Sequence, residues 1–286
     1  MAQNPIQWFP GHMAKTKRMM RECMSEVDII IELLDSRIPY SSKNPDIESI
    51  ISGKPRVTVF TKSTLANPQI TKKWIEKYES DGTRAVLIDS TTGQGIDALE
   101  AAVKATLKEK IERYEAKGMS GRRLKAMIVG IPNVGKSSLI NKIAGSKKAK
   151  VEDRPGVTLD KQWVPTKIGF DLLDMPGVLW PKFEDQTVGE NLAITGAIRD
   201  QILDIEELAM ILCVRLRDVA PDAFCARYKL SADEITDLDG YDLFELVGRK
   251  RGFLVSGGEI NHRRTAEMLL DEFRGGTIGR ISLEVP

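Results

Sequence analysis

Short apolar runs alternate with amphipathic stretches in the first half of the chain. The runs are rich in Val, Ile and Leu, and a polar, Gly or Pro turn follows each of them; they span residues 27–34, 56–60, 85–88, 126–129 and 170–173. Runs of this length and composition are typical of parallel strands buried on both faces of a sheet. Residues 162–168 predict a further strand, which we place at an edge because Pro165 cannot donate a hydrogen bond to a neighbour.

Helical spacing separates these strands. It predicts helices over residues 13–27, 68–78, 96–116 and 138–144. Strands that alternate with helices predict an α/β fold with a doubly wound, mostly parallel sheet. After Pro181 the spacing is helical almost throughout, at residues 188–198, 205–219, 232–247 and 260–273. We therefore expect two domains, a sheet-containing domain over residues 1–181 and a small all-helical domain over residues 182–286.

Composition narrows the class of protein. The 286 residues carry 42 Lys and Arg against 41 Asp and Glu, a net charge of +1, which excludes a strongly basic nucleic-acid coat protein and leaves room for a local basic patch. No apolar run reaches the ~18–20 residues of a membrane span, and the start has no apolar signal core. Three separated cysteines argue against a disulfide framework or a zinc site. We expect a cytoplasmic protein without a membrane span.

A phosphate-binding loop follows the fourth of these runs. Gly130-Ile-Pro-Asn-Val-Gly135-Lys136-Ser137 matches G-x-x-x-x-G-K-[ST] and lies between a predicted strand and a predicted helix, as the motif requires. Backbone N–H groups of such a loop surround phosphate oxygens, the lysine reaches the β- and γ-phosphates, and the serine hydroxyl coordinates Mg²⁺. The candidate nucleotide-binding residues here are Asn133, Val134, Gly135, Lys136, Ser137 and Ser138.

Two further elements follow in the order found in GTPases. Asp174-Met-Pro-Gly177 matches D-x-x-G directly after an apolar run. Asp174 is expected to hold Mg²⁺ through a water molecule, and the Gly177 N–H to sense the γ-phosphate. Thr158 occupies the position of the threonine that completes the Mg²⁺ shell.

The base-reading elements precede the phosphate loop. No N-K-x-D follows residue 177, but Thr61-Lys62-Ser63-Thr64 ends the second run and Asp89-Ser90-Thr91 ends the third, where base contacts are expected. This order indicates a circular permutation, in which residues 116–123 join the former chain ends.

These motifs, taken together, closely resemble the ribosome biogenesis GTPase A family, the YlqF group of circularly permuted bacterial GTPases. The resemblance covers the whole chain and includes Trp8-Phe-Pro-Gly-His-Met13, Asp35-Ser-Arg37-Ile-Pro39, and residues 130–139, 154–158 and 179–185. It implies a Mg²⁺-dependent switch that binds GTP and GDP, and we expect the protein to be a monomer. It also implies hydrolysis of GTP and action in late assembly of the large (50S) ribosomal subunit, with contacts to the precursor particle and its rRNA.

The resemblance also assigns roles to single residues. Val178 stands where many GTPases carry a Gln that positions the attacking water, and the family's proposed catalytic histidine maps to His12. A packing or RNA-binding role is the alternative for His12. Asn133 matches the position where potassium-stimulated GTPases hold K⁺ beside the phosphates, or is purely structural.

One motif departs from the family. Thr61-Lys62-Ser63-Thr64 replaces Asn-Lys-x-Asp, so the carboxylate that accepts two hydrogen bonds from guanine is missing. The hydroxyl of Thr64 cannot clamp the guanine edge in this way, which predicts weakened guanine selectivity. Asp89 is either a partial substitute or a turn residue.

Basic residues gather in two places that suit RNA phosphates. They are Lys15, Lys17, Arg18 and Arg21 near the start, and Arg249, Lys250, Arg251, Arg263, Arg264, Arg274 and Arg280 near the end. Two other functions compete with an assembly GTPase. One is an RNA-binding module with a vestigial or relaxed nucleotide site, which the altered base motif favours. The other is a metabolic ATPase, which is disfavoured because the chain shows no further catalytic constellation.

Overall fold

A six-stranded sheet forms the centre of the molecule. The computed structural model describes residues 12–51, 53–145 and 162–286. The strands are β1 (Ile29–Asp35), β2 (Arg56–Thr61), β3 (Arg84–Leu87), β4 (Leu124–Gly130), β5 (Gln162–Pro165) and β6 (Phe170–Asp174). Their order in the sheet is β3-β2-β1-β4-β6-β5, and all neighbouring pairs are parallel except β5 with β6. The structure thus confirms the six predicted strands and the edge position of β5, while its antiparallel direction was not predicted.

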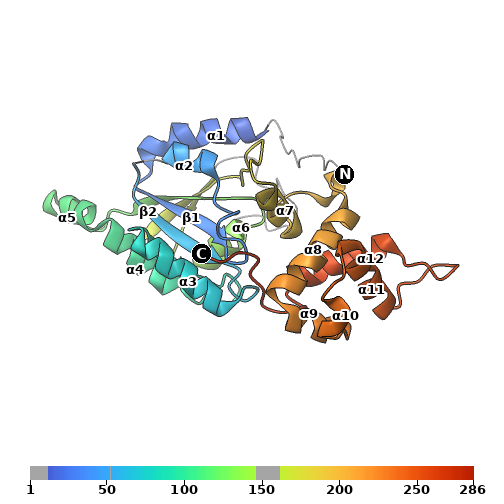
Figure 1. Ribbon diagram of the computed structural model, residues 1–286. Coiled ribbons are helices and arrows are strands. Elements are labelled where there is room, and N and C mark those ends of the chain that lie inside the picture. Colours follow the sequence, from blue (N-terminus) through green and yellow to red (C-terminus); the bar gives the residue numbers. More distant parts are fainter. Residues whose placement is uncertain (1–11, 52, 146–161) are drawn as a thin grey trace.

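Helices lie on both sides of this sheet (Figure 1). Figure 1 shows α1 (His12–Cys23) and α2 (Pro45–Ile51) on one side, with α3 (Pro68–Ser80) and α4 (Ile96–Thr106) on the other. Helix α5 (Lys108–Ala116) follows α4 and extends past the end of the sheet. Both faces of the central strands are therefore covered, and all seven residues of β1 are buried. This is why the central strands read as continuous apolar runs.

Helices in this half of the chain differ from the prediction in several places. Helix α1 ends at Cys23, before the predicted end at residue 27. Residues 96–116 form two helices that meet at the buried Leu107, and not a single long one. Helix α2 was not predicted, because seven residues are too few for a clear 3.6-residue period. The connector between α5 and β4 comprises residues 117–123, close to the expected junction.

The second half of the chain is helical after β6. Its helices are α7 (Gln186–Ile194), α8 (Ile205–Val219), α9 (Pro221–Tyr228), α10 (Ala232–Ile235), α11 (Gly240–Lys250) and α12 (His262–Arg274). The predicted bounds of α8 are confirmed, α9 was missed, and the predicted helix over 232–247 is wrong. That segment breaks because Asp239 caps a new helix by accepting a hydrogen bond from Asp242 N.

One hydrophobic core extends from the sheet into these helices. Buried Met127 of β4, Leu192 of α7 and Leu212 of α8 belong to the same cluster. Within the described residues, no helix is long and apolar enough to cross a membrane.

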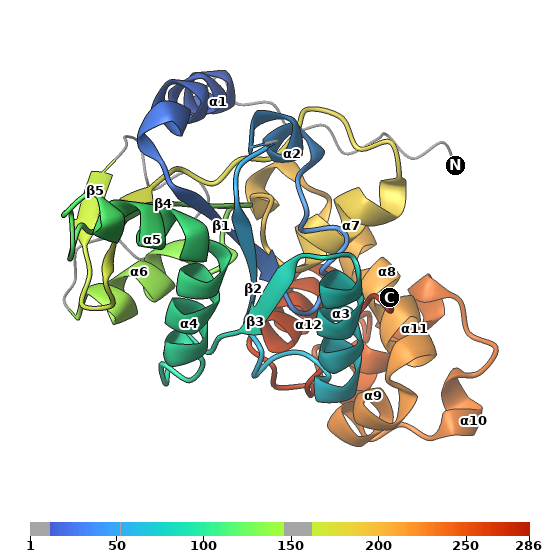
Figure 2. The ribbon, with the colours of Figure 1, turned by 90° about the vertical axis from the view of Figure 1, so that its left-hand side faces the viewer.

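The chain does not end among these helices. Figures 1 and 2 both place the end marked C beside α3, on the sheet side of the molecule. A hydrogen bond from the indole nitrogen of Trp74 in α3 to the carbonyl oxygen of Glu284 fixes that position. The segment after α12 therefore returns to the sheet, which the helical pattern did not predict.

Gly95, which precedes α4, provides a test of the fold. Its φ is +90°, and a Cβ atom there would lie 2.1 Å from the carbonyl oxygen of Leu87. We expect Gly95→Ala to lower the free energy of unfolding by about 2–3 kcal/mol, because backbone strain and a steric clash add. Gly82 has a similar φ of +80°, but a Cβ atom there would have no neighbour within 4 Å, so Gly82→Ala should cost only about 1 kcal/mol. Urea denaturation measures both, and equal losses would contradict the proposed clash.

Candidate nucleotide-binding site

The carboxyl ends of the parallel strands meet at one edge of the sheet. The strand order reverses between β1 and β4, because β2 and β3 extend the sheet on one side and β6 on the other. Open α/β sheets bind ligands in the crevice at such a point. Asp35, Thr61, Gly130 and Asp174, the last residues of β1, β2, β4 and β6, all lie at this edge.

The loop after β4 has the backbone geometry of a phosphate cradle. Gly130, Asn133 and Gly135 have φ values of +156°, +56° and +102°. A Cβ atom on Gly130 would lie 2.9 Å from the carbonyl oxygen of Leu33, so β1 closely approaches the loop at its start. Helix α6 (Lys136–Ala144) begins directly after Gly135 and turns its N-terminus toward the loop. Such helix N-termini attract phosphate groups.

Lys136 lies beneath this loop. Its side chain is buried, and its ammonium group donates hydrogen bonds to the carbonyl oxygens of Ile131 (3.0 Å) and Gly130 (3.4 Å). Burial lowers the pKa of Lys136 to about 8, and the nearby Asp174 partly opposes this effect. The ammonium group is thus held at the loop by groups that a phosphate can replace.

The D-x-x-G segment packs against the loop from the other side. A Cβ atom on Gly177 would lie 2.7 Å from both N and Cα of Pro132 and 2.9 Å from Nζ of Lys136, so only glycine fits. The backbone N–H of Val178 donates to the carbonyl oxygen of Gly130 (3.3 Å), while the Val178 side chain is fully buried. Val178 therefore cannot orient a water molecule.

Asp174 is a buried carboxylate that can accept further hydrogen bonds. It is 3% exposed, and within the described residues its Oδ1 atom has no hydrogen-bond partner. Burial raises the pKa of Asp174, whereas the charge of Lys136 lowers it. An orphaned carboxylate oxygen at this place fits a hydrated cation, because a metal-bound water donates hydrogen bonds.

Thr61 supports the phosphate loop and does not face outward. Its hydroxyl group lies 2.6 Å from the carbonyl oxygen of Val134 and 3.0 Å from that of Leu34, and the side chain is 1% exposed. A hydroxyl group has one proton for these two acceptors. The first residue of the predicted base motif therefore ties β2 to the phosphate loop.

The other residues of this motif form the loop that comes next in the chain. Lys62 has a φ of +54°, and its ammonium nitrogen lies 3.5 Å from Oδ2 of Asp35. Ser63 is buried, whereas Thr64 is exposed. Thr64 is thus the side chain of this set with the most contact to solvent.

Asp35 and Arg37 form a buried ion pair beside this loop. The Arg37 guanidinium donates to both carboxylate oxygens, at 3.0 and 2.7 Å. Although burial alone would raise the pKa of Asp35, the charges of Arg37 and Lys62 lower it well below its ordinary value. The motif Asp35-Ser-Arg37-Ile-Pro39 supported the family resemblance, but it did not predict this ion pair.

The carboxylate of Asp89 stabilises the turn in which this residue lies. Its carboxylate accepts hydrogen bonds from Thr91 N and from the Thr92 hydroxyl, both at 2.8 Å. Burial raises the pKa of Asp89, but these hydrogen bonds outweigh it and lower the pKa. The carbonyl oxygen of Thr91 accepts a hydrogen bond from Lys142 of α6 (2.9 Å). Ser90, between Asp89 and Thr91 in the sequence, is half-buried. This geometry favours a turn residue over a substitute for the missing guanine-binding carboxylate.

Two asparagines connect the site to its surroundings. The side-chain amide of Asn133 donates to the carbonyl oxygen of Gly196, just after α7 (2.8 Å). The buried Asn44 donates to the carbonyl oxygen of Val178 (2.7 Å) and also caps α2. The role of Asn44 was missed, since Asn before Pro45 signals only a helix start.

Some predicted site residues are not placed. Thr158 lies outside the described residues, as does the segment before His12. His12 is the first residue of α1. Ser137 and Ser138 lie half-buried in the first turn of α6.

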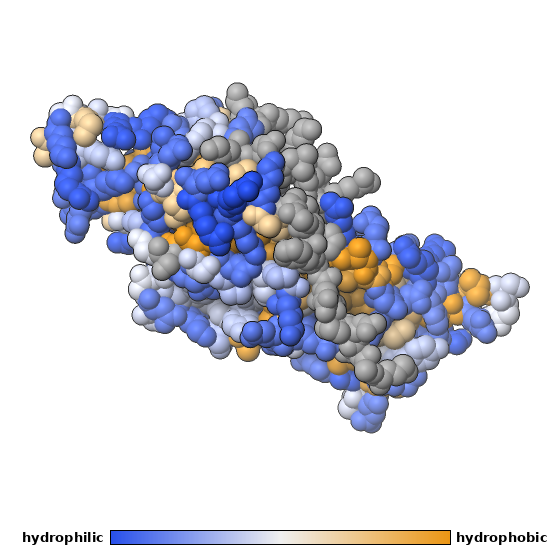
Figure 3. Space-filling model, turned by 90° about the horizontal axis from the view of Figure 1, so that it is seen from above, coloured by the Kyte–Doolittle hydropathy of each residue, from blue (hydrophilic) through white to orange (hydrophobic). Residues whose placement is uncertain are grey.

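The basic residues differ in how far they are engaged within the protein. Figure 3 shows hydrophilic side chains over α1, where Lys17 pairs with Asp46 and Arg18 lies 3.7 Å from Glu22. Arg274 donates to carbonyl oxygens of α7 and to Asp200, and Arg280 donates to carbonyl oxygens in the loop after β2. These last two side chains therefore have structural contacts.

Comparison with known proteins places these features in a family. The family described as 50S ribosome-binding GTPase matches residues 125–239. Ribosome biogenesis GTPase A from Bacillus cereus is 46% identical over 281 residues, which cover 98% of this chain and 94% of that protein. This chain belongs to the ribosome biogenesis GTPase A family. The family protein from Bacillus pumilus is 44% identical and covers 98% of this chain and 99% of its own length.

A solved structure shares the fold. YlqF from T. maritima, in its GNP-bound form, superimposes with a TM-score of 0.64 at 23% identity, over 95% of this chain and 98% of that one. The predicted fold, a circularly permuted P-loop GTPase domain joined to helices, is thereby confirmed.

The buried Lys136 predicts a pH dependence of nucleotide binding. Phosphate groups stabilise the charged form of Lys136. Above the pKa of Lys136 the free protein has lost that proton, so nucleotide binding must take up a proton and becomes weaker as the pH rises. With that pKa at about 8, affinity for GDP should fall about tenfold between pH 7 and pH 9. Titration with a fluorescent GDP analogue measures this.

Two variants check the assignment. Lys136→Arg keeps its charge throughout this range and should lose the pH dependence. Lys136→Ala should lose measurable binding, and unchanged affinity there would exclude the phosphate-loop role.

Proposed function

We propose that this chain binds GTP at the crevice between β1 and β4, hydrolyses it, and uses the cycle to bind and leave precursors of the large ribosomal subunit. Family membership makes the protein a GTP-binding and GTP-hydrolysing ribosome assembly factor. The particle, the rRNA contacts, the cytoplasmic location, the monomeric state and the site residues are the proposal. The observation that carries it is the phosphate loop, with Lys136 buried beneath it at the point where the strand order reverses.

Mg²⁺ is the proposed cofactor. The hydroxyl groups of Ser137 and Thr158 would coordinate it, and Asp174 would hold it through water. The partnerless Oδ1 of Asp174, considered within the described residues, supports this role. Bound Mg²⁺ supplies positive charge to the β- and γ-phosphates. Asn133 is the proposed K⁺ ligand, and its amide nitrogen is already engaged by Gly196.

The protein's own groups divide the work of hydrolysis. Lys136 balances the phosphate charge, and Gly177, which packs against Pro132 of the phosphate loop, offers its N–H to the γ-phosphate. Val178 is buried, so the attacking water needs another partner. We assign that role to His12, an imidazole whose neutral form can accept a proton or orient water.

The same geometry supports a switch. Gly177 touches Pro132, and the chain then continues through residues 178–185 directly into α7. The hydrogen bond from Asn133 to Gly196 adds a second link between the phosphate loop and the helical region. Loss of the γ-phosphate would therefore shift helices that contact the ribosome. An RNA-binding module with a vestigial nucleotide site is less favoured, since the phosphate loop is geometrically complete.

Guanine selectivity is tested by restoring a carboxylate at position 64. Thr64 is exposed, so an aspartate fits there without repacking the core. We expect Thr64→Asp to tighten GDP binding about 10–100-fold, the value of hydrogen bonds to a charged group, and to leave ADP binding unchanged. Thr64→Asn is the matched control, because it has the same shape without the charge. If the aspartate variant binds GDP no better than the asparagine variant, this loop does not read the base.

The role of His12 is tested against the only other histidine of the sequence, His262. His12→Ala should lower single-turnover GTP hydrolysis on large subunits by ~10²–10⁴-fold, the range for a positioned acid–base group, with nucleotide affinity unchanged. His262→Ala should retain full turnover, because His262 lies in the helical region and contacts Glu245. A subunit-binding assay accompanies both. Undiminished turnover in His12→Ala would refute the assignment, and loss explained by subunit binding alone would make His12 an RNA-docking residue.

A further inference from the structure

The segment after α12 inserts between two loops of the nucleotide site. Ile281 N donates to the carbonyl oxygen of Leu65, in the loop after β2, and Leu283 N donates to that of Arg37, in the loop after β1, both at 2.9 Å. Ile281 and Leu283 are themselves buried. Residues 280–284 thus form a tail that contacts both loops.

Side chains reinforce this contact. The hydroxyl group of Ser282 accepts a hydrogen bond from Asn67 N (3.2 Å) and donates to the carbonyl oxygen of Ser36 (3.4 Å). Gly276, just ahead of the tail, lies so close to the loop after β2 that a Cβ atom there would be 2.7 Å from Cδ2 of Leu65. The segment therefore contacts this loop both at Gly276 and along the tail.

Arg280 contacts the base loop, which comprises residues 62–66, near both of its ends. Its guanidinium group donates to the carbonyl oxygens of Ser63 (2.8 Å) and Ala66 (3.1 Å). The loop begins at Lys62 in a left-handed conformation and has a backbone hydrogen bond of its own from Leu65 N to Lys62 O. The planar fork of arginine suits two acceptors at once, which lysine cannot match.

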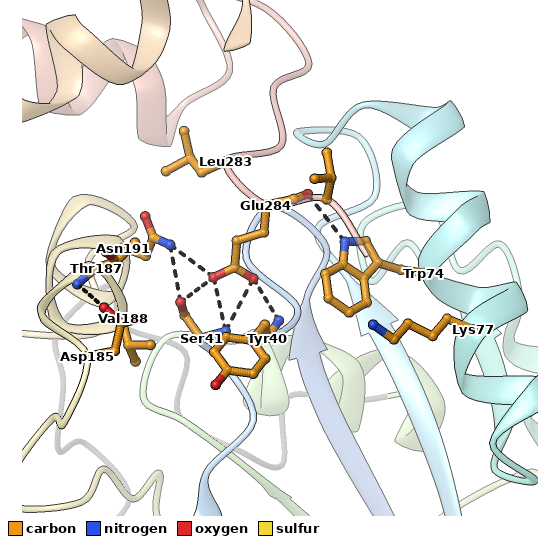
Figure 4. Close-up of a pocket in the computed structure, with 11 residues that line it drawn as sticks. Tyr40, Ser41, Trp74, Lys77, Asp185, Thr187, Val188, Asn191, Leu283 and Glu284 are labelled. Carbon is orange, nitrogen blue, oxygen red and sulfur yellow. Dashed lines mark hydrogen bonds between the residues drawn. The ribbon is translucent and has the colours of Figure 1, made fainter. Parts of the chain in front are cut away.

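Glu284 anchors the other end of the tail (Figure 4). Its carboxylate accepts hydrogen bonds from the backbone N–H groups of Tyr40 (2.7 Å) and Ser41 (3.1 Å), from the Ser41 hydroxyl, and from the amide of Asn191 in α7 (2.9 Å). Trp74 of α3 donates to its carbonyl oxygen. Donors from three separate elements therefore hold this one residue.

We propose that the tail positions the base loop for nucleotide binding, with Arg280 as the positioning residue and Glu284 as its anchor. The inference rests on the proposed function, because it assumes that this loop meets the base. Thr64 supplies no carboxylate, so recognition depends more on where the loop backbone lies. The segment that follows the helices thereby becomes part of the site that meets the base.

Arg280→Ala separates this role from general stability. GDP affinity should fall about tenfold, the scale of one or two lost hydrogen bonds, whereas the affinity for Mg²⁺-pyrophosphate, which meets only the phosphate loop, should not change. Arg280→Lys should recover part of the loss. Arg217→Ala is the matched control, because Arg217 also donates to a backbone carbonyl, that of Leu238, but within the helical region. It should leave both affinities unchanged.

Hydrogen exchange provides a readout that needs no nucleotide. Amides of residues 62–67 should exchange about tenfold faster in Arg280→Ala, while those of the phosphate loop keep their rates. Unchanged exchange there, or equal weakening of GDP and pyrophosphate, would overturn the proposal. If the unaltered protein binds pyrophosphate but not GDP, base recognition fails as a proposed function, while the exchange result still decides whether the tail orders the loop.

Discussion

The parallel pairing of β1 with β4 is the constraint on which the site depends. It aligns Ile29 with Ala126 and Leu33 with Gly130, and it joins the half of the sheet that carries the base loop to the half that carries the phosphate loop. This pairing joins two strands that are distant in sequence, and the connector at residues 117–123 leads from α5 into β4. Thr61 then adds a hydroxyl contact across the same seam. Two segments distant in sequence thus share one crevice because their strands are neighbours.

Buried charges gather around this crevice, and they differ in how far neighbouring groups compensate them. Arg37 and Lys62 stabilise the ionised form of Asp35. Among the described residues, by contrast, Lys136 donates to backbone carbonyl oxygens and lies near the partly uncompensated Asp174. The first arrangement resembles a structural ion pair, in which both carboxylate oxygens of Asp35 accept from the guanidinium group, while Nη1 of Arg37 has no hydrogen-bond partner among the described residues. In the second arrangement the charges of Lys136 and Asp174 are only partly compensated, which is typical of a site that binds a charged ligand.

The sequence predicted those parts of the structure that depend on local pattern. Buried strands read as apolar runs, and the phosphate loop and Asp174–Gly177 carry residue types that their backbone geometry requires. Thr61 was assigned to the base motif, but its burial depends on Val134, which lies 73 residues away, and no local pattern reports such a contact. Glu284 and Asn191 were missed for the same reason. Helices α2 and α9 were too short for their period to stand out, and the break before α11 came from a cap within an otherwise helical stretch.

The contact between the tail and the base loop also has a consequence in time. Leu65 and Ile281 are 216 residues apart, so at a synthesis rate of about 5–20 residues per second the loop waits roughly 10–40 s for its partner to be made. During this interval β1, β2 and β4 can already pair, and the phosphate loop can form. The nascent protein therefore passes through a stage in which the phosphate half of the crevice is built while the base half still lacks its last support.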